Sequence, residues 1–238
     1  MLMAKLDHFL ITCEHGGNRI PPRYRHLFAG FEALPQTHRG YDAGALALAR
    51  ELAIALAAPL FVSTTSRLLV DLNRSIGHPR LYSEATQDAP ATVRSEILES
   101  YYLPYRNKVE ADIAEVVDRG SRVIHVASHS FTPVLDGAVR NADIGLLYDP
   151  ARPGEVDLCR RWQAQIRALA PELKVRRNYP YAGKSDGFTA YLRRRFPAEV
   201  YIGIELEINQ KHVFNGGRRW RAFRGRVIEA LRQAVIDL

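Results

Sequence analysis

The sequence is poor in cysteine and has no long run of apolar residues. Cys13 and Cys159 are its only cysteines, and two cysteines so far apart in 238 residues favour reduced thiols over a disulfide framework. No stretch approaches the roughly 20 apolar residues that cross a bilayer, so we expect no membrane span. Residues 1–6 contain one Lys and no apolar run of signal-peptide length, so we expect a cytoplasmic protein.

Motifs for nucleotide and redox chemistry are also missing. The chain has no GxxxxGK(S/T) loop and no CxxC pair, and Gly16-Gly17 lacks the spacing of a dinucleotide-binding fingerprint. Ser130 beside His129 is no catalytic triad by itself, because a base must face its nucleophile through space. These absences argue against nucleotide-dependent and thiol-based reactions.

Acidic residues are fewer than basic ones. The chain has 26 Asp and Glu against 33 Lys and Arg, which gives a net charge of +7 and a pI of about 9.6. This balance favours an anionic partner such as a small carboxylate substrate. Dense arginines at 193–195 and 218–226 lie in segments with helical periodicity, and we interpret them as solvated helix faces. We expect no nucleic-acid binding, and a non-catalytic basic module that binds nucleic acid or a protein is the alternative from another functional class.

Short apolar runs alternate with segments of helical periodicity throughout residues 1–238, with no internal repeat and no linker. This alternation predicts a single α/β domain with a mostly parallel sheet covered on both faces. Asp42 is placed to be a helix N-cap, and Pro104 to kink a long helix. The predicted strands are residues 8–13, 60–63, 68–72, 122–127, 144–148, 174–176 and 200–206, and the predicted helices are residues 43–58, 90–119, 155–170, 187–196 and 218–236.

Polar side chains stand where four of the predicted strands end. They are Glu14-His15, Asp71 to Arg74, His129-Ser130 and Glu205. In an open α/β sheet, ligands bind outside the carboxyl ends of the strands. One crevice could therefore gather all of these side chains.

Two histidines in this set have the character of metal ligands. A catalytic zinc usually takes three protein ligands from His, Asp and Glu. His15 and His129 are the best two, because small residues flank each of them. The third ligand is open among Glu14, Asn18 and Asp42.

An acidic side chain interrupts the last predicted strand. Glu205 lies within Ile202-Gly203-Ile204-Glu205-Leu206, where burial without a partner would be costly. We predict that it is the general base, with Glu207 as the runner-up on the same face of the strand. An ion pair with an arginine is the structural alternative for Glu205.

Arginines supply candidates for substrate binding. A planar guanidinium holds a carboxylate with two parallel hydrogen bonds, and Arg67, Arg74 and Arg140 could do this. Asn73 could polarise a carbonyl beside them, and Asp71 is expected to orient one of the arginines.

The ordered set of motifs resembles the N-formylglutamate amidohydrolase family over about residues 10 to 210. The strings that carry the resemblance are Cys13-Glu14-His15-Gly16-Gly17-Asn18, Tyr41-Asp42-Ala43-Gly44-Ala45, Ser66-Arg67-Leu68, Asp71-Leu72-Asn73-Arg74, His129-Ser130-Phe131-Thr132-Pro133, Asn178-Tyr179-Pro180-Tyr181 and Gly203-Ile204-Glu205. That family is similar in turn to zinc carboxypeptidases and aspartoacylase-like enzymes. The resemblance implies a three-layer α/β/α fold of the phosphorylase/hydrolase-like, zinc exopeptidase-like kind.

The resemblance also implies a mechanism. His15 and His129 would bind one Zn2+ or another divalent metal, with Glu205 as the base. Aspartoacylase-like enzymes have a zinc-binding Glu three residues after the first His, where this chain has Asn18, so the third ligand is assigned to Asp42 with Glu14 second.

The resemblance further implies the substrate class. Asn73 and Arg74 would hold a substrate carboxylate, with Arg67, Arg140 and Ser130 as further contacts. The expected substrate is a small anionic N-acyl amino acid such as N-formyl-L-glutamate, acted on by a monomer or small homo-oligomer. A zinc carboxypeptidase or peptidoglycan amidase acting on a peptide is the alternative enzyme. The predicted loop at residues 77–90 distinguishes these two enzyme functions. A loop that forms a lid favours a small substrate, and a loop that leaves an open groove favours a peptide.

Overall fold

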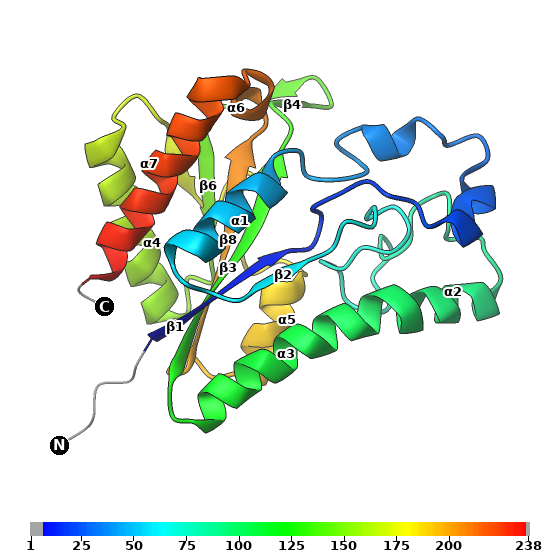
Figure 1. The fold of residues 1–238 in the computed structure, drawn as a ribbon, viewed down its shortest axis with the longest axis horizontal. Coiled ribbons are helices and arrows are strands. Elements are labelled where there is room, and N and C mark those ends of the chain that lie inside the picture. Colours follow the sequence, from blue (N-terminus) through cyan, green and yellow to red (C-terminus); the bar gives the residue numbers. More distant parts are fainter. Residues whose placement is uncertain (1–6, 237–238) are drawn as a thin grey trace.

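The computed structural model describes residues 7–236 and is built around one six-stranded sheet (Figure 1). Residues 1–6, on which the expectation about a signal peptide rests, lie outside the described residues. Neighbouring strands are parallel except for β6 and β8, which are antiparallel, so the predicted mostly parallel mixed sheet is confirmed. The strand order is β2 (Leu60–Val62), β1 (Asp7–Cys13), β3 (Arg122–Phe131), β8 (Tyr201–Asn209), β6 (Ile144–Leu147) and β7 (Val175–Arg177).

Helices cover both faces of this sheet (Figure 1). On one face α1 (Ala45–Ala55), α4 (Pro153–Leu169) and α7 (Gly217–Val235) pack around the fully buried Trp162. On the other, α3 (Leu103–Asp118) and α5 (Phe188–Arg195) enclose a smaller cluster with Phe188 at its centre. The three-layer α/β/α architecture is therefore confirmed. No helix in residues 7–236 is both long and apolar enough to span a bilayer.

The predicted long helix at residues 90–119 is a helix with an internal change of pitch. It consists of α2 (Ala91–Ile97), the π-helical turn η3 (Leu98–Tyr102) and α3. The wide turn ends just before Pro104, which has no N–H to donate to the preceding turn. The proline therefore coincides with a local widening of the helix.

The run at residues 68–72 was predicted to be a strand, and this prediction is wrong. These residues form turns, and Leu68, Leu69, Val70 and Leu72 are all buried in a separate apolar cluster together with Tyr24, Phe28 and Ile97. An apolar run that is enclosed on all sides has no alternation to distinguish a strand from an irregular segment. The remaining short elements, which the sequence did not indicate, are η1 (Pro22–Phe28), η2 (Leu34–Gln36), β4 (Val134–Leu135), β5 (Ala138–Val139) and α6 (Lys211–Phe214).

Two arginines expected on solvated helix faces are buried instead. Arg193 of α5 pairs with Glu155 at 2.9 Å and donates to the carbonyls of Gly183 and Gly203 at 2.6 and 2.7 Å. Arg224 of α7 makes two contacts of 2.8 and 2.6 Å with Glu51. These buried guanidinium groups hold elements together, so part of the positive charge is internal.

A buried histidine beneath the sheet's carboxyl edge generates a pH prediction. His125 of β3 contacts the hydroxyls of Thr12 and Tyr201 at 2.8 and 2.7 Å. Burial lowers the pKa of His125 to about 4, assisted by Arg193 and opposed by Glu14. In the unfolded chain His125 binds a proton as the pH falls below about 6.5, whereas in the folded chain it binds one only near pH 4. The stability contribution is therefore complete above about pH 6.5 and is lost as the pH falls towards 4.

In the parent protein, the free energy of unfolding should fall between pH 6.5 and 4 because the unfolded chain protonates His125. His125→Gln removes this titrating group, so we expect the fall in the variant to be smaller by up to ~3 kcal/mol. Urea unfolding followed by circular dichroism at a series of pH values measures this difference. Parallel curves for the two proteins would show that His125 does not carry the effect.

Candidate active site

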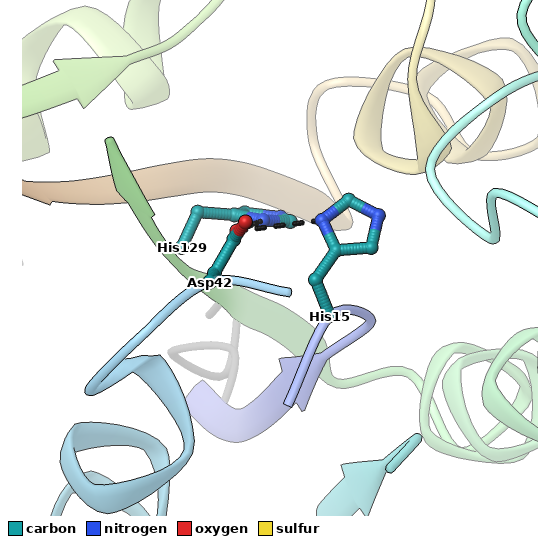
Figure 2. A group of neighbouring side chains, drawn as sticks. All are labelled: His15, Asp42 and His129. Atoms are coloured by element: carbon teal, nitrogen blue, oxygen red, sulfur yellow. Dashed lines mark hydrogen bonds and ion pairs between the residues drawn. The ribbon is translucent and has the colours of Figure 1, made fainter. Parts of the chain in front are cut away.

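Three side chains from distant parts of the chain meet at the carboxyl edge of the sheet (Figure 2). His15 follows β1, His129 belongs to β3, and Asp42 lies in the loop before α1. The Oδ2 atom of Asp42 lies 3.3 Å from Nδ1 of His15 and 2.9 Å from Nδ1 of His129. One ligand atom from each residue lies within 4.8 Å of the others, and all three residues are buried. This group could hold a metal ion.

The sequence placed Asp42 as the N-cap of a helix, and this prediction is wrong. Its carboxylate is therefore free to contact the two histidines. Helix α1 begins at Ala45 with Gly44 as its N-cap residue, and no side chain makes a capping bond. Gly44 has a φ of 82°, and a Cβ there would lie 2.5 Å from Val213. Only glycine fits this turn easily, and the turn aims the Asp42 carboxylate at the histidines. The Asp42 N–H also donates to the His15 carbonyl at 2.9 Å.

His129 lies within a strand and does not follow one, because β3 and β8 extend further than predicted. The expected strands stop at residues 127 and 206, but the observed ones reach Phe131 and Asn209. Polar side chains can continue a strand when they face a shared polar site. Strand pairing places His129 directly opposite Glu207, and both side chains therefore stand on the same face of the sheet.

The outer nitrogen of each histidine also faces a carboxylate. Nε2 of His15 lies 2.7 Å from Oδ1 of Asp71. Nε2 of His129 lies 3.1 Å from Oε2 of Glu14, an ion-pair distance without the alignment of a hydrogen bond. A neutral imidazole carries one N–H, so it cannot donate to carboxylates on both sides. Each ring therefore requires extra positive charge, from a second proton or from a shared cation.

The pKa values follow from this crowding of charges. Burial alone would raise the pKa of Asp42, but the two histidines outweigh burial and hold it well below its usual value. Burial also opposes the shift at Glu14, yet the contact with His129 lowers the pKa of Glu14 to about 2. Arg67 and His15 likewise hold the pKa of Asp71 well below its usual value against burial. All three carboxyl groups are thus ionised at neutral pH.

Two further carboxylates of β8 face the same cavity. Glu205 accepts a hydrogen bond from the Thr189 hydroxyl at 2.6 Å. Glu207 is buried, and its Oε2 atom has no hydrogen-bond partner among the described residues. Burial raises the pKa of Glu207 to about 8, and the nearby Asp42 and Glu205 add to this effect while His129 opposes it.

The cavity beside the three-residue group has a volume of about 340 Å³. Arg67 lines it and is held by Asp71 at 2.6 Å, as the sequence suggested for Asp71. Arg74 donates to the Asp186 carbonyl at 2.6 Å and has a buried Nε without a partner among the described residues. The other lining residues are His15, Asp42, Asn73, Arg80, His129, Ser130, Leu135, Tyr181, Ala182, Ser185, Asp186, Glu205 and Glu207.

Some predicted site residues lie elsewhere or are already engaged. Neither Asn18 nor Arg140 lines the cavity. The Asn18 side chain donates a hydrogen bond to Gln36, and Arg140 packs over the rings of Phe131 and Tyr181. Ser130 lines it, but its hydroxyl donates to the Ala43 carbonyl at 2.8 Å and accepts a bond from Gln210. Ser130 therefore helps to fix the loop that carries Asp42.

One cavity residue lies in a motif that could suggest a different chemistry. Residues 183–187 have the spacing Gly-Lys-Ser-Asp-Gly, which fits the GxSxG elbow of serine hydrolases. Ser185 lines the cavity, but no histidine within residues 7–236 lies within hydrogen-bond distance of its hydroxyl. A serine nucleophile needs such a base, so the motif has no triad here.

The chain is similar to known proteins over most of its length. The model of the N-formylglutamate amidohydrolase family matches residues 7–214. The crystal structure of gene product Atu2144 from Agrobacterium tumefaciens superposes with a TM-score of 0.82 at 30% identity, over 98% of this chain and 92% of that one. N-formylglutamate amidohydrolase from Ralstonia eutropha JMP134 superposes with a TM-score of 0.66 at 19% identity, over 95% and 92% of the two chains.

A more distant structural similarity is also found. Succinylglutamate desuccinylase from Chromobacterium violaceum gives a TM-score of 0.45 at 15% identity, over 98% of this chain and 65% of that one. The search of curated proteins found no match. The family match covers most of the chain, and the Agrobacterium structure is similar over nearly all of it. The chain therefore belongs to the N-formylglutamate amidohydrolase family, which is a family of amide-bond hydrolases.

Proposed function

We propose that this protein is a zinc-dependent amidohydrolase that removes the acyl group from a small acidic N-acyl amino acid such as N-formyl-L-glutamate. The observation that carries the proposal is the pair of imidazoles of His15 and His129, each placed between two carboxylates. Such an arrangement needs added positive charge, and a divalent cation held by His15, Asp42 and His129 would supply it.

The donor set fits zinc. Two imidazole nitrogens and one carboxylate oxygen form a three-ligand set of the kind that leaves a fourth position open in catalytic zinc sites. Asp71 and Glu14 on the outer nitrogens would fix the rings and make them more basic ligands. A zinc ion held there would polarise the scissile carbonyl and make a water molecule acidic enough to lose a proton near neutral pH.

The chain itself must accept and return a proton. Both Glu205, which the sequence favoured, and the runner-up Glu207 line the cavity. The contacts favour Glu207, because it stands opposite His129 and has an oxygen without a partner, whereas Thr189 holds one oxygen of Glu205. The raised pKa of Glu207, about 8, keeps this group largely protonated at neutral pH, so it would act as a base only in its deprotonated form. In that form Glu207 would take the proton of the attacking water and deliver it to the amine nitrogen as the carbon–nitrogen bond breaks.

Arginines of the cavity wall would hold the acidic amino acid. Arg74 has a buried Nε without a partner within residues 7–236, and Arg67 is fixed by Asp71. Asn73 uses its Oδ1 atom to accept the Phe188 N–H at 2.6 Å, and its amide NH2 remains to meet a substrate oxygen. Two guanidinium groups suit a substrate that carries two carboxylates.

Zinc content tests the metal centre directly. We expect purified protein to hold about one zinc per chain and to release glutamate from N-formylglutamate, and His129→Ala to lose most of both. His26→Ala, at an exposed histidine of η1, is the matched control and should retain both. Elemental analysis and an amine-release assay measure the two quantities. A His129→Ala protein with full zinc content would exclude this site as the metal centre.

Separate glutamine variants test the proton acceptor. We expect Glu207→Gln to keep its zinc and lose about 10²–10⁴-fold in kcat, because an amide cannot accept the proton. Glu205→Gln should retain more activity and is the matched variant on the same strand. The reverse order of losses, at equal zinc content, would assign the proton transfer to Glu205.

A further inference from the structure

A larger second cavity adjoins the catalytic one. Its volume is about 780 Å³, and four residues line both cavities: Arg67, Arg80, Leu135 and Tyr181. We call it the outer chamber. The remaining lining residues come mainly from the loop after Gly77 and from the β4–β5 hairpin, and they are His38, Arg39, Leu68, Asp71, Pro79, Tyr82, Ser83, Glu84, Gln87, Val134 and Asp136.

The size of the outer chamber exceeds what a formyl group can use. Cavities on the order of 300–1,000 Å³ hold ligands of drug size. The catalytic cavity, at about 340 Å³, already lies in this range, and the outer chamber, at about 780 Å³, has more than twice the volume of the catalytic cavity. A formyl group has a single carbon and would leave the outer chamber to water.

The charges of the chamber indicate what it could bind. Arg39 is paired with Glu84 at 2.6 Å, and Arg67 is paired with Asp71 at 2.6 Å. Arg80 differs, since within residues 7–236 its guanidinium has no carboxylate partner and its only hydrogen bond is from its backbone N–H to His78. Arg80 therefore offers an uncompensated cation at the junction of the two cavities.

The rest of the wall is suited to a short carbon chain. Leu68, Leu135, Tyr82 and Tyr181 give apolar and aromatic surface beside Arg80. Asp136, in the turn of the β4–β5 hairpin, is a lining carboxylate without an ion-pair partner within residues 7–236. It would repel an anion and therefore marks the side of the chamber that an anionic group avoids.

The orientation of the substrate rests on the proposed function. Asn73 and Arg74 line only the catalytic cavity, whereas His38 and Arg39 line only the outer chamber. With the amino acid's carboxylate on Arg74 and the acyl carbonyl at the three-residue group, an acyl chain of several carbons would have Arg80 available to it, because Arg80 lines both cavities. We propose that the outer chamber binds an acyl chain of several carbons that ends in its own carboxylate, and that Arg80 holds this carboxylate.

The reaction with such a substrate remains a simple hydrolysis. Water adds to the acyl carbonyl carbon, the carbon–nitrogen bond breaks, and the amine nitrogen receives the proton. The products are a dicarboxylate and a free amino acid, and no further reactant is required.

A matched pair of substrates tests the proposal. N-succinylglutamate and N-butyrylglutamate have acyl chains of equal carbon number and differ in the terminal carboxylate. We expect the native enzyme to have a kcat/KM for the succinyl compound about ten- to a hundredfold above that for the butyryl compound, with N-formylglutamate as the reference. Arg80→Gln should reduce this ratio about tenfold or more. Asp136→Asn should raise it.

Arg25→Gln is the control, because Arg25 is an exposed arginine of η1 that lines neither cavity, and it should leave the ratio within about twofold. Cleavage of N-formylglutamate without preference for succinyl over butyryl would overturn this proposal alone. An Arg80→Gln protein that loses activity equally on both compounds would also overturn it. Failure to release glutamate from any of the three compounds, with zinc bound, would instead overturn the proposed function.

Discussion

The site depends on one buried oxygen, Oδ2 of Asp42, which lies within 3.3 Å of an imidazole nitrogen from each of two histidines. Burying a carboxylate costs several kcal/mol unless charge and hydrogen bonds compensate it. His15 and His129 provide that compensation, and they in turn need Asp71 and Glu14 behind them. The five side chains form one electrostatic unit, and removing any member weakens the charge compensation of its neighbours.

The fold is organised so that this unit can assemble. Parallel pairing of β1 with β3 brings the ends of both strands to one edge, and pairing of β3 with β8 adds Glu207 beside His129. Gly44 lets the chain turn so that Asp42 reaches the same point from the loop before α1. Strand register sets the positions of His129 and Glu207, and the end of β1 sets that of His15, whereas Asp42 and Asp71 reach the site from loops.

Much of this could be predicted from the sequence, and the exceptions have physical causes. Apolar periodicity located the sheet and its covering helices, and polar residues after strands located the site. Periodicity did not identify the turns at residues 68–72, because that run is buried on all sides. The sequence also did not indicate that Arg80 lines both cavities, since an arginine in a loop has no pattern that distinguishes a cavity wall from a surface. The pairing of Glu14 with His129 depends on atom positions, which spacing along the chain does not encode.

Asp71 joins the proposed metal centre to the proposed substrate-binding surface. Its Oδ1 atom contacts Nε2 of His15 at 2.7 Å and accepts the Asn73 N–H at 2.9 Å, while its Oδ2 atom holds Arg67 at 2.6 Å. One carboxylate therefore orients His15, which we propose as a metal ligand, and Asn73 and Arg67, which we propose as substrate-binding residues. Loops usually vary more than strands, and most of the cavity wall is loop. Because Asp71 ties Arg67 and Asn73 to His15, change is restricted on this part of the wall, and the parts of the outer chamber that these contacts do not reach are where we expect substrate preference to diverge.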